Sequence, residues 1–434
     1  MPKAIIVGGS IAGVCCAHSL IHAGWKVTVV EKSPGPPTGS ATGAGLGLDP
    51  QSRQIIASWL PVPDLLHQST LPLTIDQNQA TDAETKSSWV LARDEEFNFR
   101  AAHWTDLHHL LYTALPPEAA SFLWGHLFLS FSISQDNSKP SVSVQARTLQ
   151  TGEIVEITGD LLVAADGCLS AVRRAFLPDL ELRLLKDMPF VPHFLSRYSG
   201  YCAWRGVLDF SENEDSDTIT GIRRAYPDLG KCLYFDLSTR GTHSVFYELL
   251  NKRLNWIWYV HHPQPELKGS SVTMKVSKEM IQDMIQKAEQ VWTPELVRVM
   301  AETKEPFLNL IYDCEPLEKL FWDNVVLVGD AAHPTTPHCL RSTNMSILDA
   351  AVLGKCVEKS GVENLSSGLD EYQQIRLPVI SKQVIHSRHV GRIKQRLSVP
   401  DWKLFDPKAA RSVDCEEIQQ KNMPLFSSAP LSLH

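Results

Sequence analysis

The first thirty residues alternate between strand-like and helix-like patterns of apolar positions. Ala4 to Val7 is a short apolar run, typical of a strand that is buried on both faces. Apolar side chains then recur from Ile11 to Ile21 at roughly helical spacing, and Gly24 stands where a glycine often ends a helix. Trp25 to Val30 is a second strand, rich in β-branched residues. This strand–helix–strand order predicts a βαβ unit with parallel strands.

A glycine-rich turn joins the first strand to the helix. It reads Gly8-Gly9-Ser10-Ile11-Ala12-Gly13, and Glu31 ends the second strand, 31 − 13 = 18 residues beyond the last glycine. Glycines in this turn and an acid at about this spacing are typical of a dinucleotide-binding unit. The glycines permit the tight turn and the close packing of helix on strand. Ser10 replaces the usual middle glycine and still permits fairly close backbone approach.

This unit predicts a nucleotide cofactor. The free N–H groups at the start of the helix, together with its positive dipole end, can hold a pyrophosphate. A carboxylate at position 31 can accept hydrogen bonds from a ribose diol and disfavours a 2′-phosphate there. The residues that we predict to bind the cofactor are Gly8, Gly9, Ser10, Ile11, Ala12, Gly13, Glu31 and Lys32.

Two later apolar strands end in acidic turns. They are 161–165, which runs into Asp166-Gly167, and 324–328, which runs into Gly329-Asp330. A helical stretch, 345–355, follows the second turn. Because parallel sheets bind ligands beyond the carboxyl ends of their strands, we expect Asp330 to touch a cofactor hydroxyl. The alternative is an aspartate that caps the following helix and contacts no ligand.

The three motifs, in this order, resemble the flavoprotein aromatic hydroxylases, the family that includes para-hydroxybenzoate hydroxylase. The resemblance covers residues 3 to about 392. It implies an α/β fold in which a Rossmann-like FAD-binding domain, with a βαβ unit as in glutathione reductase, is interleaved with a substrate domain built on a mixed and antiparallel sheet. The implied divisions are an FAD-binding domain of 1–75, 98–180 and 310–392, a substrate domain of 76–97 and 181–309, and a C-terminal tail of 393–434.

The resemblance also assigns roles to the motifs. In that family the glycine turn holds the ADP part of FAD, and the Asp-Gly motif serves FAD and NAD(P)H together. The Gly-Asp motif places its acid on ribityl or ribose hydroxyls. Further cofactor-binding residues are implied at Trp104, Asp166, Gly329, Asp330, Arg341, Thr343 and Asn344. Trp104 stands where the family usually has an arginine.

A narrower resemblance links the chain to the branch that contains dihydroxypyridine hydroxylase. The segments that carry it are 38–47, 103–104, 198–206 and 254–259. The whole chain is also similar to plant-type FAD/NAD(P)-binding oxidoreductases, which bring no secure substrate. The chain departs from the family at Cys339 and Ser342, where glycines are usual beside the flavin ring. A thiol at 339 could crowd the ring, react there, or simply pack. Leu184 to Arg197 is an extra segment that could distort the edge of the substrate domain.

Candidate catalytic residues lie in the middle of the chain and after the Gly-Asp motif. Arg205 interrupts an apolar run, so it needs a partner, either a substrate anion or a structural carboxylate. The resemblance places the loop of Pro337 at the substrate end of the flavin. The catalytic candidates are Arg205, Pro337, His333 and Tyr201. The aromatic residues between 198 and 260 suit either a cavity wall or a sheet core.

Composition narrows the classes of function. The chain has 41 Lys and Arg against 49 Asp and Glu, a net charge of −8, which argues against a basic nucleic-acid binder or a polybasic membrane surface. Nine cysteines without a C-x-x-C pair, and histidines without ligand spacing, favour free thiols and no metal. No signal peptide or membrane span is indicated, so we expect a cytoplasmic protein, with a homodimer left open.

The sequence therefore predicts an FAD-dependent, NAD(P)H-using monooxygenase. It would hydroxylate a small aromatic or heteroaromatic substrate with O2, by resemblance through a C4a-hydroperoxyflavin. Two alternatives stay open: a flavin oxidase or dehydrogenase that inserts no oxygen, and a flavin-binding protein with lost catalysis. No general base stands out from the sequence.

Overall fold

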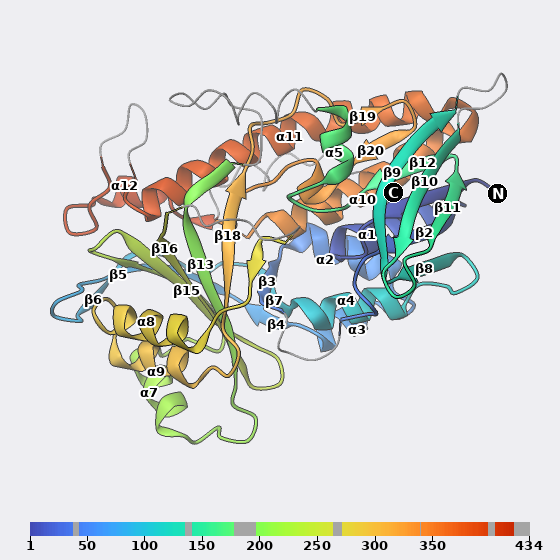
Figure 1. The fold of residues 1–434 in the computed structure, drawn as a ribbon. Helices are drawn as coiled ribbons and strands as arrows, with labels where there is room; N and C mark the ends of the chain where they lie inside the picture. The colour runs from blue at the N-terminus through green and yellow to red at the C-terminus, as the bar shows by residue number, and fades with distance from the viewer. Residues whose placement is uncertain are drawn as a thin grey trace.

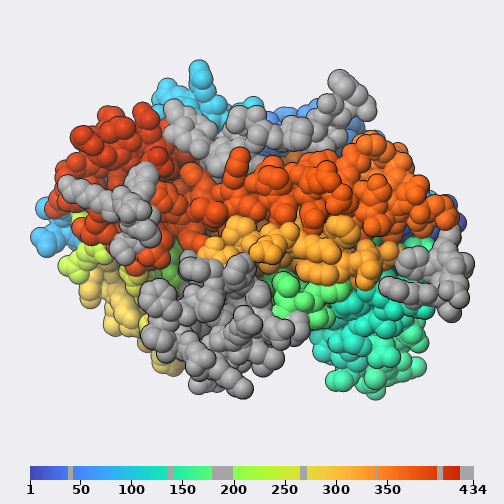
Figure 2. Space-filling model, turned by 90° about the horizontal axis from the view of Figure 1, so that it is seen from above, coloured from blue at the N-terminus to red at the C-terminus, as the bar shows by residue number. Residues whose placement is uncertain are grey.

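The computed structural model describes residues 1–37, 43–134, 141–177, 197–263, 271–338, 340–397 and 404–420. Within these ranges two large β-sheets lie side by side, and the long helix α11 (Leu365–Lys394) runs past both of them (Figure 1). Figure 2 shows α11 as an orange band across one face of the molecule. None of the described helices combines the length and the apolar character that a membrane span needs.

The first large sheet contains the predicted βαβ unit at its centre. Its strand order is β19-β20-β12-β1-β2-β8, and every pair is parallel except β19 with β20. The strands are β1 (Lys3–Val7), β2 (Lys26–Glu31), β8 (Ala120–Trp124), β12 (Leu161–Ala164), β19 (Phe321–Trp322) and β20 (Val325–Leu327). The central strands are almost wholly buried, as expected where both faces of a parallel sheet are covered.

Helices and a small antiparallel sheet cover this parallel sheet. Helix α1 (Ile11–His22) packs against α10 (Ser342–Ser360). The covering sheet has the order β11-β10-β9, with β9 (His126–Ser134), β10 (Ser141–Thr148) and β11 (Ile154–Gly159). Shorter helices complete this part: α2 (Pro50–Trp59), α3 (Asp64–Gln68), α4 (Trp104–Thr113), α5 (Ala171–Phe176), η1 (Gly329–Ala331) and η2 (Val362–Asn364).

The second large sheet has the order β17-β18-β13-β16-β15-β14-β5-β6, in which only β14 and β5 pair in parallel. Its strands are β5 (Ile75–Thr81), β6 (Ser88–Asp94), β13 (Arg197–Asp209), β14 (Cys232–Ser238), β15 (Thr242–Leu249), β16 (Arg253–His261), β17 (Thr273–Met274) and β18 (Phe307–Asp313). The strands of residues 75–94 thus join a sheet whose other members come after residue 196.

Each face of this sheet packs against something different. Three helices cover one face: α7 (Asp217–Ala225), α8 (Lys278–Glu289) and α9 (Pro294–Glu302). The other face looks toward the small sheet β3-β7-β4, which Figure 1 shows between the two large sheets. This small sheet consists of β3 (Gly45–Leu48), β4 (Leu71–Leu73) and β7 (Phe99–His103). Since side chains alternate along a strand, β13 turns Trp204 to the helices and Arg205 to the opposite face.

The alternation also decides between the two interpretations of the aromatic residues. Trp256 and Trp258 on β16 face α8 and α9 and belong to the core, whereas Tyr259 turns to the opposite face. The tryptophans are therefore sheet core, and only the intervening positions can form a cavity wall.

Residues 404–420, within the predicted C-terminal tail, pack against the rest of the described structure. Helix α12 (Ser412–Glu416) lies in the described segment 404–420, in which Cys415 and Ile418 are buried. The backbone N–H of Gln420 donates to Asp76 Oδ2 on β5, at 3.0 Å. The extra segment Leu184–Arg197 lies almost wholly outside the described residues, and Cys339 lies outside them as well.

A buried carboxylate connects the Gly-Asp turn to the two long helices. Asp349 on α10 accepts from the N–H of Gly329 at 2.9 Å and contacts His333 Nε2 at 2.6 Å and Arg376 Nε at 2.7 Å. Burial alone would raise the pKa of the Asp349 carboxyl, but His333 and Arg376 together lower that pKa to about 2. The group is therefore ionised at neutral pH and ties η1, α10 and α11 together.

We predict that Asp349→Asn lowers the free energy of unfolding by about 3–5 kcal/mol, because it leaves the buried guanidinium of Arg376 without its counter-charge. Urea unfolding followed by fluorescence would measure the loss. The matched control is Asp283→Asn, which breaks an exposed ion pair with Lys287 and should cost less than about 1 kcal/mol. Equal losses in the two variants would contradict the anchoring role.

Candidate active site

The turn between β1 and α1 requires its glycines. Gly8 has a φ of +101°, and a Cβ on it would lie 2.3 Å from the carbonyl oxygen of Ala165. A Cβ on Gly13 would lie 1.9 Å from the carbonyl oxygen of Gly8. Ser10 is the N-cap residue of α1, but its side chain makes no hydrogen bond to the helix. The N–H groups of the first turn are therefore not capped by Ser10. The turn thus brings backbone, and not side chains, to the end of the sheet.

A cavity of about 740 Å³ opens beside this turn. Most of the predicted cofactor residues on this side of the molecule line it, namely Gly8, Gly9, Ser10, Glu31, Lys32, Trp104 and Asp166. Ile11, Ala12 and Gly13 do not line it, because they form the first turn of α1. Residues that sequence reasoning missed include His108, Trp124 and Arg174. His108 contacts the carbonyl oxygen of Gly9 through Nε2 at 2.7 Å and so fastens α4 to the turn.

The two acids at this cavity also hold the backbone that shapes it. Glu31 Oε2 accepts from the N–H of Gly9 at 2.7 Å, and its Oε1 accepts from the N–H of Ser33 at 2.8 Å. Asp166 Oδ2 accepts from the N–H of Ala171 at 2.7 Å, at the start of α5. Asp166 therefore caps a helix as well as lining the cavity, a role that its sequence motif did not reveal.

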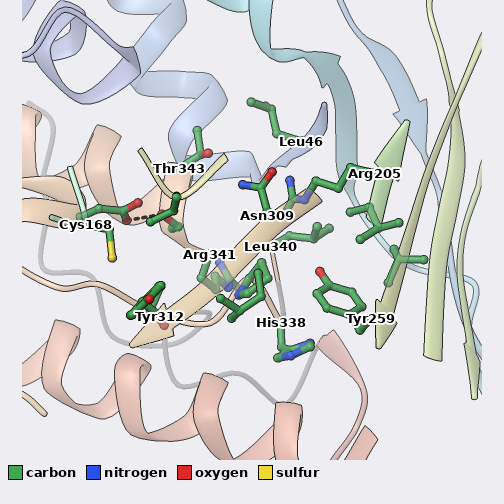
Figure 3. Close-up of a pocket in the computed structure, with 18 of the residues that line it drawn as sticks. Leu46, Cys168, Arg205, Tyr259, Asn309, Tyr312, His338, Leu340, Arg341 and Thr343 are labelled. Atoms are coloured by element: carbon green, nitrogen blue, oxygen red, sulfur yellow. Dashed lines mark hydrogen bonds between the residues drawn. The ribbon is translucent and has the colours of Figure 1, made fainter. Parts of the chain in front are cut away.

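A second cavity, of about 260 Å³, lies between the Gly-Asp turn, β3 and the eight-stranded sheet. Figure 3 shows Arg205, Asn309, Tyr259 and His338 around it. The predicted residues that line it are Arg205, Asp330, Pro337, Arg341 and Thr343. The two cavities adjoin, because Gly167 and Leu169 line the larger one while Cys168 between them lines the smaller one. The two cavities therefore lie close together.

Strand β3 approaches the eight-stranded sheet closely at Gly45. Its N–H donates to Asn255 Oδ1 at 2.7 Å, and a Cβ there would lie 2.7 Å from Tyr247 Oη. Asn255 and Tyr247 are therefore positioning residues that sequence reasoning missed. Their role can be recognised only in the structure, because they contact Gly45 from a distant part of the sequence.

Residues in and after the Gly-Asp turn form hydrogen bonds and an ion pair that hold the segments around the smaller cavity together. Asp330 Oδ1 accepts from Ser342 Oγ, the first residue of α10, at 2.6 Å. Arg341 Nη1 pairs with Asp49 Oδ2 at 2.8 Å, and both side chains are buried. Asn344 Nδ2 donates to the carbonyl oxygen of Gly47 at 2.9 Å. Gly329 is buried in the core, where a Cβ would lie 2.9 Å from Ala12. Arg341 and Asn344 thus bind segments of this chain to one another.

The four catalytic candidates separate into two groups. Arg205 and Pro337 line the smaller cavity, and Arg205 Nε has no hydrogen-bond partner in the described part of the chain. Tyr201 and His333 do not line it. His333 is buried against Asp349, so the geometry gives it an anchoring role in place of the predicted catalytic one.

Tyr201 reaches the cavity through a residue that sequence reasoning missed. Its hydroxyl contacts His338 Nε2 at 2.9 Å, and His338 lines the cavity. Burial lowers the pKa of His338 well below its usual value, with added effects from Lys394 and Arg205. The position directly after Pro337 was the one signal in the sequence that could have marked His338.

No group of three or more His, Cys, Asp or Glu side chains within the described ranges is arranged to hold a metal ion. The polar groups of the site instead suit hydrogen bonding to an organic ligand. The larger cavity is lined by the backbone of the glycine turn, and the smaller cavity is lined by both polar and apolar side chains.

Comparison with known proteins identifies an FAD binding domain and a shared fold. Residues 2–181 match the model of the FAD binding domain. Aurachin C monooxygenase/isomerase of Stigmatella aurantiaca is 29% identical over 244 residues, which are 55% of this chain and 53% of that protein. 6-Hydroxynicotinate 3-monooxygenase of Pseudomonas fluorescens is 23% identical over 88% of this chain and 89% of its own length. The structure of 2,6-dihydroxypyridine-3-hydroxylase from Arthrobacter nicotinovorans superimposes with a TM-score of 0.69 at 21% identity, covering 93% of this chain and 96% of that one.

The strand order of the parallel sheet and the interleaved second sheet are accordingly those of FAD monooxygenase structures. On these grounds residues 2–181 are an FAD binding domain, and the chain has the fold of FAD-dependent monooxygenases.

Proposed function

We propose that the protein is an FAD-dependent, NAD(P)H-using monooxygenase that hydroxylates a small aromatic or heteroaromatic ring. The observation that carries the proposal is the pair of adjoining cavities. The larger has a volume of about 740 Å³ and a glycine-rich backbone lining that suit a dinucleotide, and the smaller has the size and polarity that suit a single substituted ring.

The residues around the larger cavity fit FAD. Gly8 and Gly9 offer backbone at the N-terminus of α1, where a pyrophosphate is held by N–H groups and the helix dipole. Glu31 stands at the end of β2, in reach of a ribose. Asp330 lines the adjoining cavity, where its carboxylate would accept a hydrogen bond from a cofactor hydroxyl. Bound FAD would supply acceptance of hydride from NAD(P)H and activation of O2.

The smaller cavity supplies the contacts for a substrate. Leu46, Phe235, Ile257 and Leu340 give it apolar walls against the faces of a ring. Arg205 brings a cation to the lining of the cavity, which suits a carboxylate or an ionised ring oxygen. Two relatives bear the names of enzymes that act on hydroxylated pyridine rings, which supports a heteroaromatic substrate.

Replacing Glu31 tests the nucleotide end of the site. We expect Glu31→Ala to weaken FAD binding roughly ten- to a hundredfold, because it removes charge-assisted hydrogen bonds worth about 1.5–3 kcal/mol. Titration of the apoprotein with FAD, followed by flavin fluorescence, measures the affinity. Glu153→Ala changes an exposed acid that does not line the cavity and should leave the affinity unchanged. An affinity within about twofold of the parent for Glu31→Ala would refute the ribose contact.

A pair of variants separates the two interpretations of Asp330. If Asp330 contacts a cofactor hydroxyl, Asp330→Ala should release FAD, whereas Ser342→Ala should retain it because it removes only the hydrogen bond at the start of α10. Flavin content after purification and the dissociation constant of added FAD are the measurements. Equal retention by both variants would refute the cofactor contact.

Turnover tests the reaction itself. With FAD bound, a panel of phenols, pyridinols and purines should include a ring that stimulates NAD(P)H oxidation and gains an oxygen atom from labelled O2. NAD(P)H consumption without oxygen insertion would indicate an oxidase or dehydrogenase. With an accepted anionic substrate, Arg205→Gln should raise KM about ten- to a hundredfold at unchanged FAD content. Arg298→Gln, an exposed arginine on α9, is the matched control and should behave as the parent.

A further inference from the structure

A second polar side chain accompanies Arg205 in the smaller cavity. It is Asn309 on β18, the strand that pairs antiparallel with β13. The register places Asn309 opposite Ala203, and Arg205 is two residues further along β13, on the same face of the sheet. Diagonal neighbours of this kind lie roughly 7–8 Å apart, within reach of a long side chain. Figure 3 shows both side chains extending from the sheet into the cavity.

The alternation along β18 shows which way Asn309 faces. Leu308 and Leu310 pack into the core beneath the covering helices, whereas Ile311 belongs to the cluster on the opposite face of the sheet. Asn309 shares the face of Ile311. Its amide therefore stands at the cavity and not in the helix-covered core.

The described part of the chain makes no use of the Asn309 amide. Oδ1 is buried and has no hydrogen-bond partner among the described residues. Nδ2 has no acceptor among them either, but unlike Oδ1 it is not shut off from the cavity. Because Asn309 is half-buried and lines the cavity, Nδ2 is the end of the amide that a ligand can reach.

The charge of Arg205 is likewise unmatched within the described residues. None of their carboxylates pairs with it, whereas the charge of Arg341 on the same cavity is matched by Asp49. Asp330 is the one acid among the described lining residues, and its Oδ1 already accepts from Ser342. The sequence left open whether Arg205 meets a substrate anion or a structural carboxylate. Within the described ranges the structural carboxylate is absent, which favours the anion.

The two donors lie at one side of an otherwise apolar wall. Strands β14, β15 and β16 line the cavity with Phe235, Val245 and Ile257. The neighbouring strands β13 and β18 bring Arg205 and Asn309. A flat ring that packs against the apolar strands therefore directs a polar substituent toward β13 and β18, where it meets hydrogen-bond donors and a positive charge.

We propose that Asn309 is a specificity-determining residue, whose Nδ2 donates a hydrogen bond to a carboxylate on the substrate ring while Arg205 binds the same carboxylate. A carboxylate has two oxygens and about four lone-pair sites, enough for a guanidinium and an amide together. A single ring oxygen offers fewer sites, and a neutral carboxamide brings N–H donors against the donors of the cavity. The proposal rests on the proposed function and narrows its substrates to aromatic acids.

The test measures ligand binding to the FAD-loaded protein by calorimetry at neutral pH, without NAD(P)H, so that it needs no turnover. The probes are matched pairs: benzoate with benzamide, 4-hydroxybenzoate with 4-hydroxybenzamide, and nicotinate with nicotinamide. We expect the parent to bind at least one carboxylate more than about tenfold more tightly than its carboxamide. Phenol, which has a ring oxygen but no carboxylate, should bind no more tightly than the carboxamides.

Substitution at Asn309 separates a contact with the carboxylate from a role in packing. Asn309→Leu keeps the size of the side chain and the charge of Arg205 but removes the amide. It should weaken carboxylate binding about tenfold and leave carboxamide binding within about twofold. When it is combined with Arg205→Gln, the loss should be smaller than the product of the two single losses, because both side chains hold one group.

Controls show that these effects belong to the cavity. Asn213→Leu, at an exposed position that does not line the cavity, is the matched control and should behave as the parent. FAD content shows whether each variant is folded. If Asn309→Leu does not retain FAD, Asn309→Ser serves as the second variant, because its shorter side chain also removes the amide, and the same selective loss is expected.

Any of the following results would overturn the proposal: no carboxylate preferred over its carboxamide by the parent, a loss in Asn309→Leu that is absent or equal for both members of a pair, or fully independent losses in the double variant. These results leave the labelled-oxygen experiment unaffected, so oxygen insertion into another ring would uphold the proposed function while Asn309 loses its assigned role. Conversely, a carboxylate preference that depends on Asn309 would stand even if no ring gained oxygen.

Discussion

The buried carboxylate of Asp349 is the interaction on which the rest of the site depends. It holds the Gly329 turn through a backbone N–H, the following loop through His333, and α11 through Arg376. The loop that carries Pro337 and His338 begins at this anchor, and α11 brings Gly391 against it from behind. A buried charge with partners on three segments fixes their relative positions. Separating Arg376 would leave a buried charge without compensation, and separating Gly329 or His333 would break a buried hydrogen bond.

The two large sheets contribute to the site in different ways. The parallel sheet presents backbone at the ends of β1 and β12, where glycines bring the chain close to a ligand. The eight-stranded sheet presents side chains, because alternation along β13 and β16 sends every second residue toward the cavity. With the proposed function, the cofactor would be contacted mostly by backbone and the substrate mostly by side chains.

Local patterns predicted the parts of the molecule that local physics determines. The βαβ unit, the glycine turn and the positions of Glu31 and Asp330 follow from short-range sequence signals, because a tight turn and a strand end constrain nearby residues directly. The fold class was confirmed by the shared architecture of FAD monooxygenase structures. Helix α10 begins earlier than the apolar pattern indicated, at Ser342, since Ser342 bonds to Asp330.

What the sequence did not predict depends on contacts between distant residues. His333 is the clearest case, because only the fold brings Asp349 to it and makes it an anchor. The roles of His338, Asn255 and Tyr247 likewise arise where separate strands and a loop meet. The packing of residues 404–420 was missed for the same reason, since its partner Asp76 is 344 residues away from Gln420.

The pairing of β5 with β14 has a consequence for how the chain reaches this structure. The two strands are neighbours in the sheet but far apart in the sequence. A side-chain hydrogen bond between them, from Gln79 to Asp236, joins residues that are 157 positions apart. During synthesis the β5–β6 hairpin leaves the ribosome long before β14, which pairs with β5. Residues 404–420, which bond to β5 through Asp76, follow later still. Contacts of such long range slow folding, and strand edges stay exposed until their partner strands have been synthesised. The βαβ unit, whose strands are close in sequence, can therefore form early, whereas the eight-stranded sheet is completed late.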